Sequence, residues 1–134
     1  MIVVDTSAIV AIIKAEPETD RLIAAITGSD RCFMSAVGVF EASMVIIGAG
    51  SGDRARMVDR FLAESAIEIV PFDEAQSLAS REAFVRFGKG RHPAGLNFGD
   101  CISYALAKTR GLPLLYKGAD FAKTDIASAL TASA

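Results

Sequence analysis

The sequence predicts an α/β fold with a mainly parallel central sheet. Short apolar runs without polar alternation, such as residues 2–4 and 67–70, are typical of strands buried on both faces. Longer segments between such runs, for example residues 52–64, carry apolar residues at helical spacing. Strands that alternate with helices along a chain favour parallel pairing.

The first half of the chain predicts three strands and four helices. Asp5, Thr6 and Ser7 supply helix-capping chemistry directly after the first strand, and Ser35 does so before the third helix. The expected strands are residues 2–4, 31–34 and 67–70. The first expected helix ends near residue 13, and three further helices are expected at residues 18–26, 36–49 and 52–64.

The second half predicts two further helices and one or two strands. A helix is expected to about residue 87, before a loop of Gly, Pro and basic residues at 88–93. Asn97 begins the next helix, which stops at Gly111. We expect a fourth strand at residues 112–116 and a last strand-like segment near Ile126.

The composition predicts one folded domain over residues 1–134. With 51% hydrophobic and 22% charged residues the chain can bury a core, and no apolar stretch approaches the ~20 residues that span a bilayer. The first residues lack the basic region of a signal peptide, so a cytoplasmic location is expected. Cys32 and Cys101 are expected to be reduced core thiols. Because the net charge is -2, RNA binding would need local basic patches and a bound cation.

Four acidic residues are expected to meet at one edge of the sheet. Asp5 follows the first strand, and Glu41 lies about two turns into the helix after the second strand. Asp100 lies in the first turn of its helix, and Asp120 follows the fourth strand. Parallel strands joined by right-handed crossovers present their carboxyl ends at the same edge, where open α/β sheets bind ligands.

Converging carboxylates predict a bound cation. Two unit charges ~4 Å apart repel by about 4 kcal/mol at an effective dielectric of 20, so either a cation lies among them or a pKa rises. Oxygen ligands favour Mg²⁺ or Mn²⁺, whereas zinc would need more than the one histidine of this chain. A water kept by Mg²⁺ can attack a phosphodiester while the ion neutralises charge on the phosphoryl oxygens.

Each acid also has a structural interpretation when taken singly. Asp5 could only cap the first helix, and Asp100 could only stabilise the first turn of its own helix. Asp120 could be a turn residue, and Glu41 could be an exposed side chain on an apolar helix. The functional hypothesis therefore depends on the set of four.

Short motifs occur along nearly the whole chain: VDTSA at 4–8, SAVGVFE at 35–41, LNFGDC at 96–101, YALA at 104–107, LLYKGADF at 114–121 and TD at 124–125. Taken together and in this order, they resemble the VapC toxins of bacterial toxin-antitoxin pairs, which are PIN-domain nucleases. Each motif alone is weak, but the full order is specific.

The resemblance implies a three-layer α/β/α PIN-like fold and a Mg²⁺-dependent endoribonuclease that dimerises and is inhibited by a cognate antitoxin. By this resemblance Asp5 and Asp100 are the metal ligands, while Glu41 and Asp120 complete the catalytic set. Thr6 or Ser7 matches a hydroxyl that supports the first aspartate. Many relatives carry Asp or Asn where this chain has Ala119, which reduces the polar character of that turn. Asp125 matches a common acid of the family, although a structural role in a turn is the alternative.

The basic loop before the Asp100 helix is a candidate RNA contact. Lys89, Arg91 and His92 could hold phosphates that the acidic edge repels, although a solvated loop is the plainer interpretation. His92 is also considered as a general acid. The apolar residues 8–13 could face the core, a dimer partner or an antitoxin.

Two other classes of protein compete with the nuclease hypothesis. A signalling receiver also has an acidic Mg²⁺ pocket at the sheet edge, but it needs an Asp where the third strand here ends in Pro71-Phe72, and it has no use for Glu41. A catalytically inert RNA-binding or partner-binding module could keep the fold. A cleavage assay with and without Mg²⁺ separates that module from the enzyme.

Overall fold

Parallel strands form the centre of the molecule, which is described here by a computed structural model over residues 1–130. Within that range the sheet has four strands in the order β3-β2-β1-β4, all parallel. The last four residues of the predicted domain lie outside the described residues. The strands are β1 (Ile2–Val4), β2 (Cys32–Ser35), β3 (Ile67–Val70) and β4 (Leu114–Leu115).

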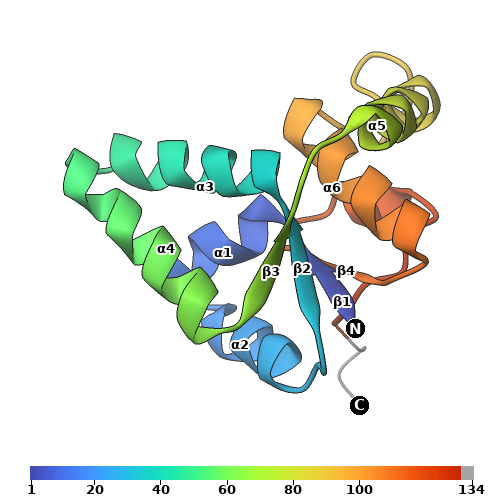
Figure 1. Cartoon of the computed structure of the whole chain (residues 1–134). Helices are drawn as coiled ribbons and strands as arrows, with labels where there is room; N and C mark the ends of the chain where they lie inside the picture. Colours follow the sequence, from blue (N-terminus) through green and yellow to red (C-terminus); the bar gives the residue numbers. More distant parts are fainter. Residues whose placement is uncertain (131–134) are drawn as a thin grey trace.

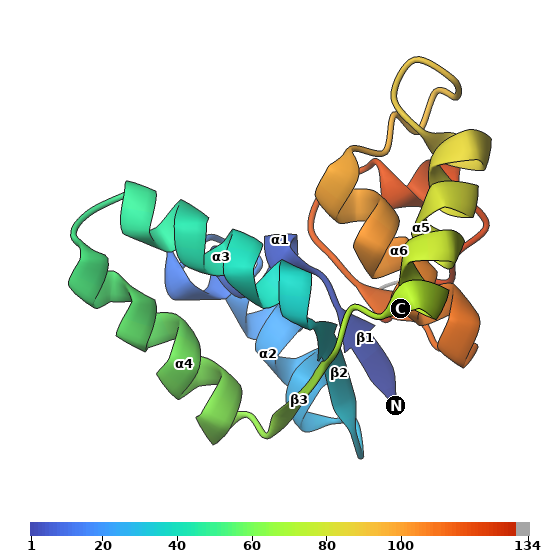
Figure 2. The same cartoon turned by 45° about the horizontal axis from the view of Figure 1, so that its top comes forward.

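Helices cover both faces of this sheet, which gives three layers (Figure 1). One outer layer holds the first four helices and the other holds the last two, on opposite sides of the sheet in Figure 2. The helices are α1 (Thr6–Ile13), α2 (Thr19–Thr27), α3 (Ala36–Gly48), α4 (Ala55–Glu64), α5 (Glu74–Phe87) and α6 (Phe98–Arg110). The predicted α/β/α architecture is confirmed.

Alternate residues of the central strand point into two separate cores. Val4 packs with the apolar residues of α1 to α4, whereas Val3 packs with those of α5 and α6. Both side chains are fully buried. The continuous apolar run of β1 follows from this position, because neither face of the strand meets water.

Single residues determine where several helices begin and end. Asp5 and Ser35 each end a strand and cap the helix that follows, so α1 and α3 start without an intervening loop. Gly111, with a φ of 64°, ends α6 in the left-handed conformation as the sequence predicts. A short 3-10 helix at Gly52–Arg54 precedes α4, so the predicted helix over residues 52–64 has two parts.

The predictions for the last strands are wrong in extent. The fourth strand covers Leu114–Leu115 and not residues 112–116, because the Leu112 N–H bonds back to α6 and Pro113 has no N–H to donate. The segment predicted near Ile126 forms only a single parallel bridge, between Leu114 and Ser128.

Both cysteines are buried and free within the described chain. Burial raises the pKa of the Cys32 thiol, and burial together with the charge of Asp100 raises the pKa of Cys101 to about 11. Both are therefore protonated core thiols at neutral pH. Among residues 1–130 no helix combines the length and hydrophobicity needed to cross a bilayer.

Candidate active site

Asp5 lies at the carboxyl end of the central strand and is almost completely buried, with 3% of its surface exposed. Its main-chain N–H donates to Leu115 O at 2.9 Å, which ties it to β4. Its carboxylate accepts the Ser7 N–H at 3.0 Å as the cap of α1. The position of this carboxylate is therefore fixed by two strands and one helix.

Asp100 is held at the start of α6 by a reciprocal pair of hydrogen bonds. Its carboxylate accepts the Asn97 N–H at 3.1 Å, while its own N–H donates to the Asn97 side chain at 2.9 Å. This capping box fixes the first turn of the helix. The carboxylate is only half-buried, so its remaining lone pairs can face a ligand.

The other three acids act on the charge of Asp100. Burial raises the pKa of Asp100 to about 6, and the Asn97 hydrogen bond opposes the rise. The negative charges of Asp5, Asp120 and Glu41 raise the pKa further. Because Coulomb interactions of this kind need proximity, Asp5, Glu41 and Asp120 each lie near Asp100 at the sheet edge.

Glu41 reaches this edge from the opposite layer. It projects from α3, and its carboxylate lies against the backbone of Gly99 at the start of α6. A Cβ atom on Gly99 would lie 2.4 Å from Glu41 Oε2, closer than any real contact. The absence of a side chain at position 99 is thus what lets Glu41 lie beside Asp100.

Asp120 is the most exposed of the four acids. It follows β4 and precedes the 3-10 helix Phe121–Lys123, and its side chain makes no capping bond there. Neither Asp120 nor Glu41 has a side-chain hydrogen bond to any described residue. These two carboxylates can therefore rotate, whereas Asp5 and Asp100 are fixed.

The acids share one electrostatic environment without forming a closed set of ligands. Within residues 1–130, no three Asp, Glu, His or Cys side chains stand close enough together to hold an ion as placed. The donor set still fits a hard divalent cation, because all four donors are carboxylates and their repulsion raises the pKa of Asp100. Rotation of the Glu41 and Asp120 carboxylates is what would close such a site.

The two predicted supporting hydroxyls connect the elements around Asp5. Thr6 Oγ1 donates to Gly38 O at 3.1 Å and so joins α1 to α3. Ser7 Oγ accepts the Lys117 N–H at 2.9 Å and joins α1 to the turn after β4. Within the described chain neither hydroxyl bonds the Asp5 carboxylate, which the Ser7 main chain supports.

The basic loop lies directly before the Asp100 helix, as predicted. Lys89 and Arg91 are exposed, and Arg91 Nε donates to Val85 O at 3.2 Å. His92 is half-buried: its Nδ1 accepts the Ala94 N–H at 3.0 Å, and its ring meets the Phe87 ring edge-on at 5.0 Å. The contacts of His92 hold the loop, which leaves the two cations as the candidates for RNA phosphates.

Sequence reasoning missed a charge cluster around Asp125 and the pairing of Lys117. Lys117 Nζ pairs with Glu16 and lies 3.6 Å from Glu18, so the loop after α1 meets the turn after β4. These carboxylates raise the pKa of Lys117. The sequence carries no signal for this pairing, since the partners lie about 100 positions apart and have no regular spacing.

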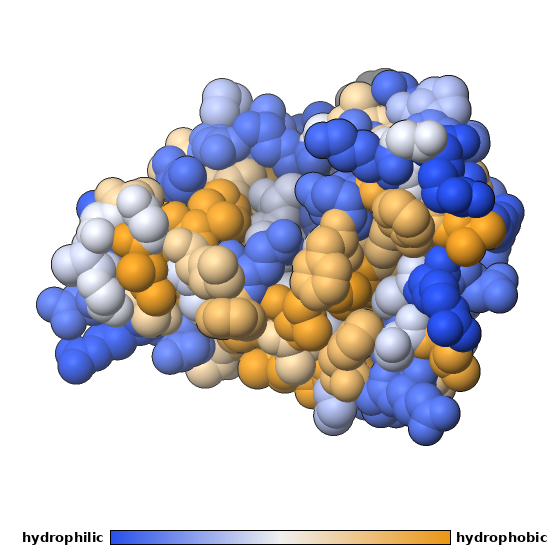
Figure 3. Space-filling model, turned by 90° about the horizontal axis from the view of Figure 1, so that it is seen from above, coloured by the Kyte–Doolittle hydropathy of each residue, from blue (hydrophilic) through white to orange (hydrophobic). Residues whose placement is uncertain are grey.

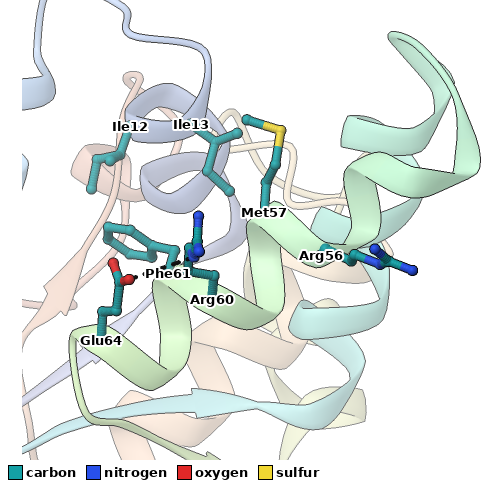
Figure 4. A pocket seen from close by; sticks show the side chains of 7 residues that line it. All are labelled: Ile12, Ile13, Arg56, Met57, Arg60, Phe61 and Glu64. Atoms are coloured by element: carbon teal, nitrogen blue, oxygen red, sulfur yellow. Dashed lines mark ion pairs between the residues drawn. The ribbon is translucent and has the colours of Figure 1, made fainter.

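A groove of about 700 Å³ runs between α1 and α4 (Figure 4), which lie on the other side of the sheet from α5 and α6 (Figure 2). Ile12 and Ile13 line it from α1, and Met57 and Phe61 line it from α4. Its polar residues are Arg56, Arg60 and Glu64, with Arg60 Nε 3.6 Å from Glu64 Oε1. The apolar residues 8–13 are thus explained mostly by the core, while Ile12 and Ile13 also line this groove.

Exposed apolar residues gather at the edge that carries the acids. Figure 3 views this edge and shows apolar surface across its middle, beside hydrophilic residues. The exposed fractions are 65% for Phe40 and 57% for Met44 on α3, 44% for Phe84 on α5 and 76% for Phe98 on α6. We call these four side chains the apolar face.

Comparison with known proteins gives the family. The family model of the PIN domain matches residues 2–127 of this chain. Ribonuclease VapC30 of Mycobacterium tuberculosis is 44% identical to this chain over 126 residues. The chain belongs to the VapC family of PIN domains. The alignment with VapC30 covers 94% of this chain and 96% of the relative.

Solved VapC structures share the fold. The M. tuberculosis toxin VapC20, described as cleaving the sarcin-ricin loop, gives a TM-score of 0.77 at 15% identity, with 94% of this chain and 96% of VapC20 covered. The DNA-bound VapBC complex of Salmonella typhimurium gives 0.73 at 16% identity, with 95% and 94% covered. At these identities the likeness concerns the fold alone.

Proposed function

We propose that this VapC-family chain is a cytoplasmic toxin that hydrolyses RNA phosphodiester bonds with the help of Mg²⁺, or of Mn²⁺ in its place. One observation carries the proposal: at the carboxyl edge of the sheet, burial and the negative charges of Asp5, Asp120 and Glu41 raise the pKa of Asp100 to about 6. Such a concentration of negative charge is unfavourable without a cation.

The fixed and the rotatable acids have different roles in this proposal. Asp5 and Asp100, whose positions are set by capping bonds, would hold the cation. Glu41 and Asp120 would complete the site when their side chains turn toward it. When bound, a divalent cation supplies charge that activates water and offsets the charge of the phosphate.

The cations of the loop would orient the RNA backbone. Lys89 and Arg91 are exposed on the loop that precedes α6, the helix that carries Asp100, so we expect these two cations to hold phosphates of the substrate. Phosphate contacts position a nucleic acid without reading its sequence. The loop would therefore raise affinity and would not select the cleavage site.

A cleavage assay with purified protein tests the activity. We expect Mg²⁺-dependent cleavage of RNA that EDTA stops and that Asp5→Asn and Asp100→Asn each abolish. Both variants should keep the fold, because Asn caps a helix such as α1 as well as Asp5 does, and the amide oxygen in Asp100→Asn can still accept the Asn97 N–H. Glu68→Gln is the matched control, since it removes an acid from an exposed ion pair with Arg31 near the amino ends of the strands.

Two results would count against the enzyme. Full cleavage by both site variants would mean that other groups perform the reaction. A wild-type protein that binds RNA but leaves it intact in both Mg²⁺ and Mn²⁺ would favour the inert module.

We also propose that a segment of the cognate antitoxin occupies the groove between α1 and α4. The groove combines apolar walls with Arg56 and Arg60 at its rim, which suits an amphipathic segment with acidic side chains. Ile13→Glu should weaken binding of the antitoxin in a calorimetric titration and leave cleavage unchanged. Leu78→Glu, an exposed apolar position on α5, is the control.

A homodimer is proposed through the apolar face. An exposed patch of this kind marks an interaction site, and a two-fold dimer buries the same patch of both copies. Phe40→Glu should convert the protein to a monomer in light-scattering measurements. A dimer that survives both Phe40→Glu and Phe98→Glu would place the interface elsewhere.

A further inference from the structure

Asp125 is the centre of a charge cluster that the proposed reaction does not use. The Tyr104 hydroxyl donates a short hydrogen bond to Asp125 Oδ1. Lys108 Nζ lies 3.0 Å from Asp125 Oδ2, and Arg86 Nη2 lies 3.3 Å from the same oxygen. One exposed turn is thereby attached to both α5 and α6.

The partners of Asp125 lie on the face of α6 that carries Asp100. Asp100, Tyr104 and Lys108 are spaced by four residues, so their side chains follow one another along one face of the helix. Asp120 acts on the first of these residues, and Asp125 binds the other two. The chain from residue 120 to 125 therefore runs along α6, with Asp120 at its amino end.

The start of the same segment is attached to the other fixed acid. Ser7 Oγ accepts the Lys117 N–H, and Ser7 is the residue whose own N–H holds the Asp5 carboxylate. Between these two attachments Phe121 is buried at 3% exposure, with its ring 5.0 Å from that of Tyr116. Asp120 itself has no side-chain hydrogen bond to the described residues, so its place depends on the attachments of its segment.

We propose that Asp125 is a positioning residue: by binding Tyr104 and Lys108 it sets the register of the 117–125 segment on α6 and so places Asp120 beside Asp100. The proposal rests on the proposed function, in which Asp120 belongs to the site. A slip by one helical turn would move the segment by about 5.4 Å, which is enough to remove Asp120 from the cluster.

The charge state of the cluster keeps this attachment intact at neutral pH. The Tyr104 hydroxyl bond, with the nearby Lys108 and Arg86 charges, lowers the pKa of Asp125 to about 2. Burial and the Asp125 carboxylate raise the pKa of Tyr104 to about 12. The acid stays ionised and the phenol stays protonated between these values, so the hydrogen bond does not change with physiological pH.

A double-mutant cycle tests the proposal. The variants are Asp125→Ala, Asp120→Asn and the two combined, with Glu68→Ala as a control that breaks an ion pair far from the acids. Single-turnover RNA cleavage is measured in Mg²⁺. The dissociation constant of Mn²⁺ is measured by electron paramagnetic resonance, which needs no activity, and unfolding is measured for every variant.

We expect Asp125→Ala to weaken Mn²⁺ binding and to slow cleavage by about 10-fold, as loss of an outer residue of a metal site does. In the Asp120→Asn background the same change should have no further effect on either quantity. Its effect on stability should be the same in both backgrounds. Tyr104→Phe, which keeps both ion pairs, should give a smaller loss in the same direction.

Unchanged Mn²⁺ affinity in Asp125→Ala would overturn the proposal. So would a double variant whose loss of Mn²⁺ affinity equals the sum of the losses, in free energy, of Asp125→Ala and Asp120→Asn. An equal effect of Glu68→Ala would also overturn it, since general destabilisation would then be the cause. A wild-type protein that binds Mn²⁺ but cleaves no RNA would refute the proposed function alone, because the Mn²⁺ titrations still decide whether Asp125 positions Asp120.

Discussion

Replacing Asp100 by Asn should stabilise the protein at neutral pH in the absence of metal. The pKa of this carboxyl is raised from 3.8 to about 6, so the folded state disfavours its ionised form. A shift of about two units corresponds to about 3 kcal/mol at 1.36 kcal/mol per unit. Because the carboxylate is half-exposed and solvent screens its charge, we expect a net gain of about 1 to 2 kcal/mol.

The stability gained in Asp100→Asn should depend on pH. Between pH 3.8 and about 6 the folded state binds more protons at Asp100 than the unfolded state does, so the stability of the wild type falls as the pH rises. Below that window Asp100 is protonated in both states, and the penalty is absent. The difference between Asp100→Asn and the wild type should thus be small at pH 4 and complete by pH 7.

Urea denaturation in EDTA at several pH values measures this difference. At pH 4 the difference in free energy of unfolding between Asp100→Asn and the wild type reports the amide substitution without the charge. This difference is subtracted from the difference measured at pH 7. Added Mg²⁺ should then raise the stability of the wild type and leave that of the variant unchanged. A difference that is the same at pH 4 and pH 7 would show that Asp100 carries no charge penalty, and our electrostatic account of the site would fail.

Three further substitutions test the contacts around the site. Gly99→Ala should displace the Glu41 carboxylate and so slow cleavage. The melting temperature should change little, because the new Cβ would meet Glu41 Oε2, the end of a flexible side chain. Wild-type cleavage kinetics in this variant would contradict the placement of Glu41. Thr6→Val removes the hydrogen bond to Gly38 and should lower the free energy of unfolding by about 1 kcal/mol in urea, while an unchanged midpoint would mean that this bond adds nothing. Gly111→Ala places a Cβ at a φ of 64° and should cost about 1 kcal/mol by calorimetry, unless the end of α6 rearranges.

The helices could be predicted from the sequence because single residues at their ends determine where each helix begins and stops. Asp5, Ser35 and Asn97 cap the helices that they precede, and Gly111 ends α6, each as the residue type alone indicates. The predicted fourth strand was too long because strand extent depends on partners. Apart from β1, Leu114 finds only a single bridge, to Ser128, so the pairing does not extend.

The candidate site could be predicted in part. The carboxyl edge of a parallel sheet follows from topology, which is why Asp5 and Asp100 could be assigned to one place. The contact of Glu41 with Gly99 could not, since it depends on how closely two helices from opposite layers approach. The attachments of Asp125 were also missed, because they join side chains across an exposed turn. The catalytic roles of all these acids remain predictions.

The order of strands in the sheet has a consequence for synthesis of the protein on the ribosome. Strand β4 pairs with β1, and the Ser7 hydroxyl bonds the main chain of Lys117, 110 positions later. Contacts of such long sequence separation form late, since loop closure must precede them. A growing chain that ends before Asp120 lacks part of the acidic cluster, so the proposed activity should begin only after the segment that carries Asp120 has been translated.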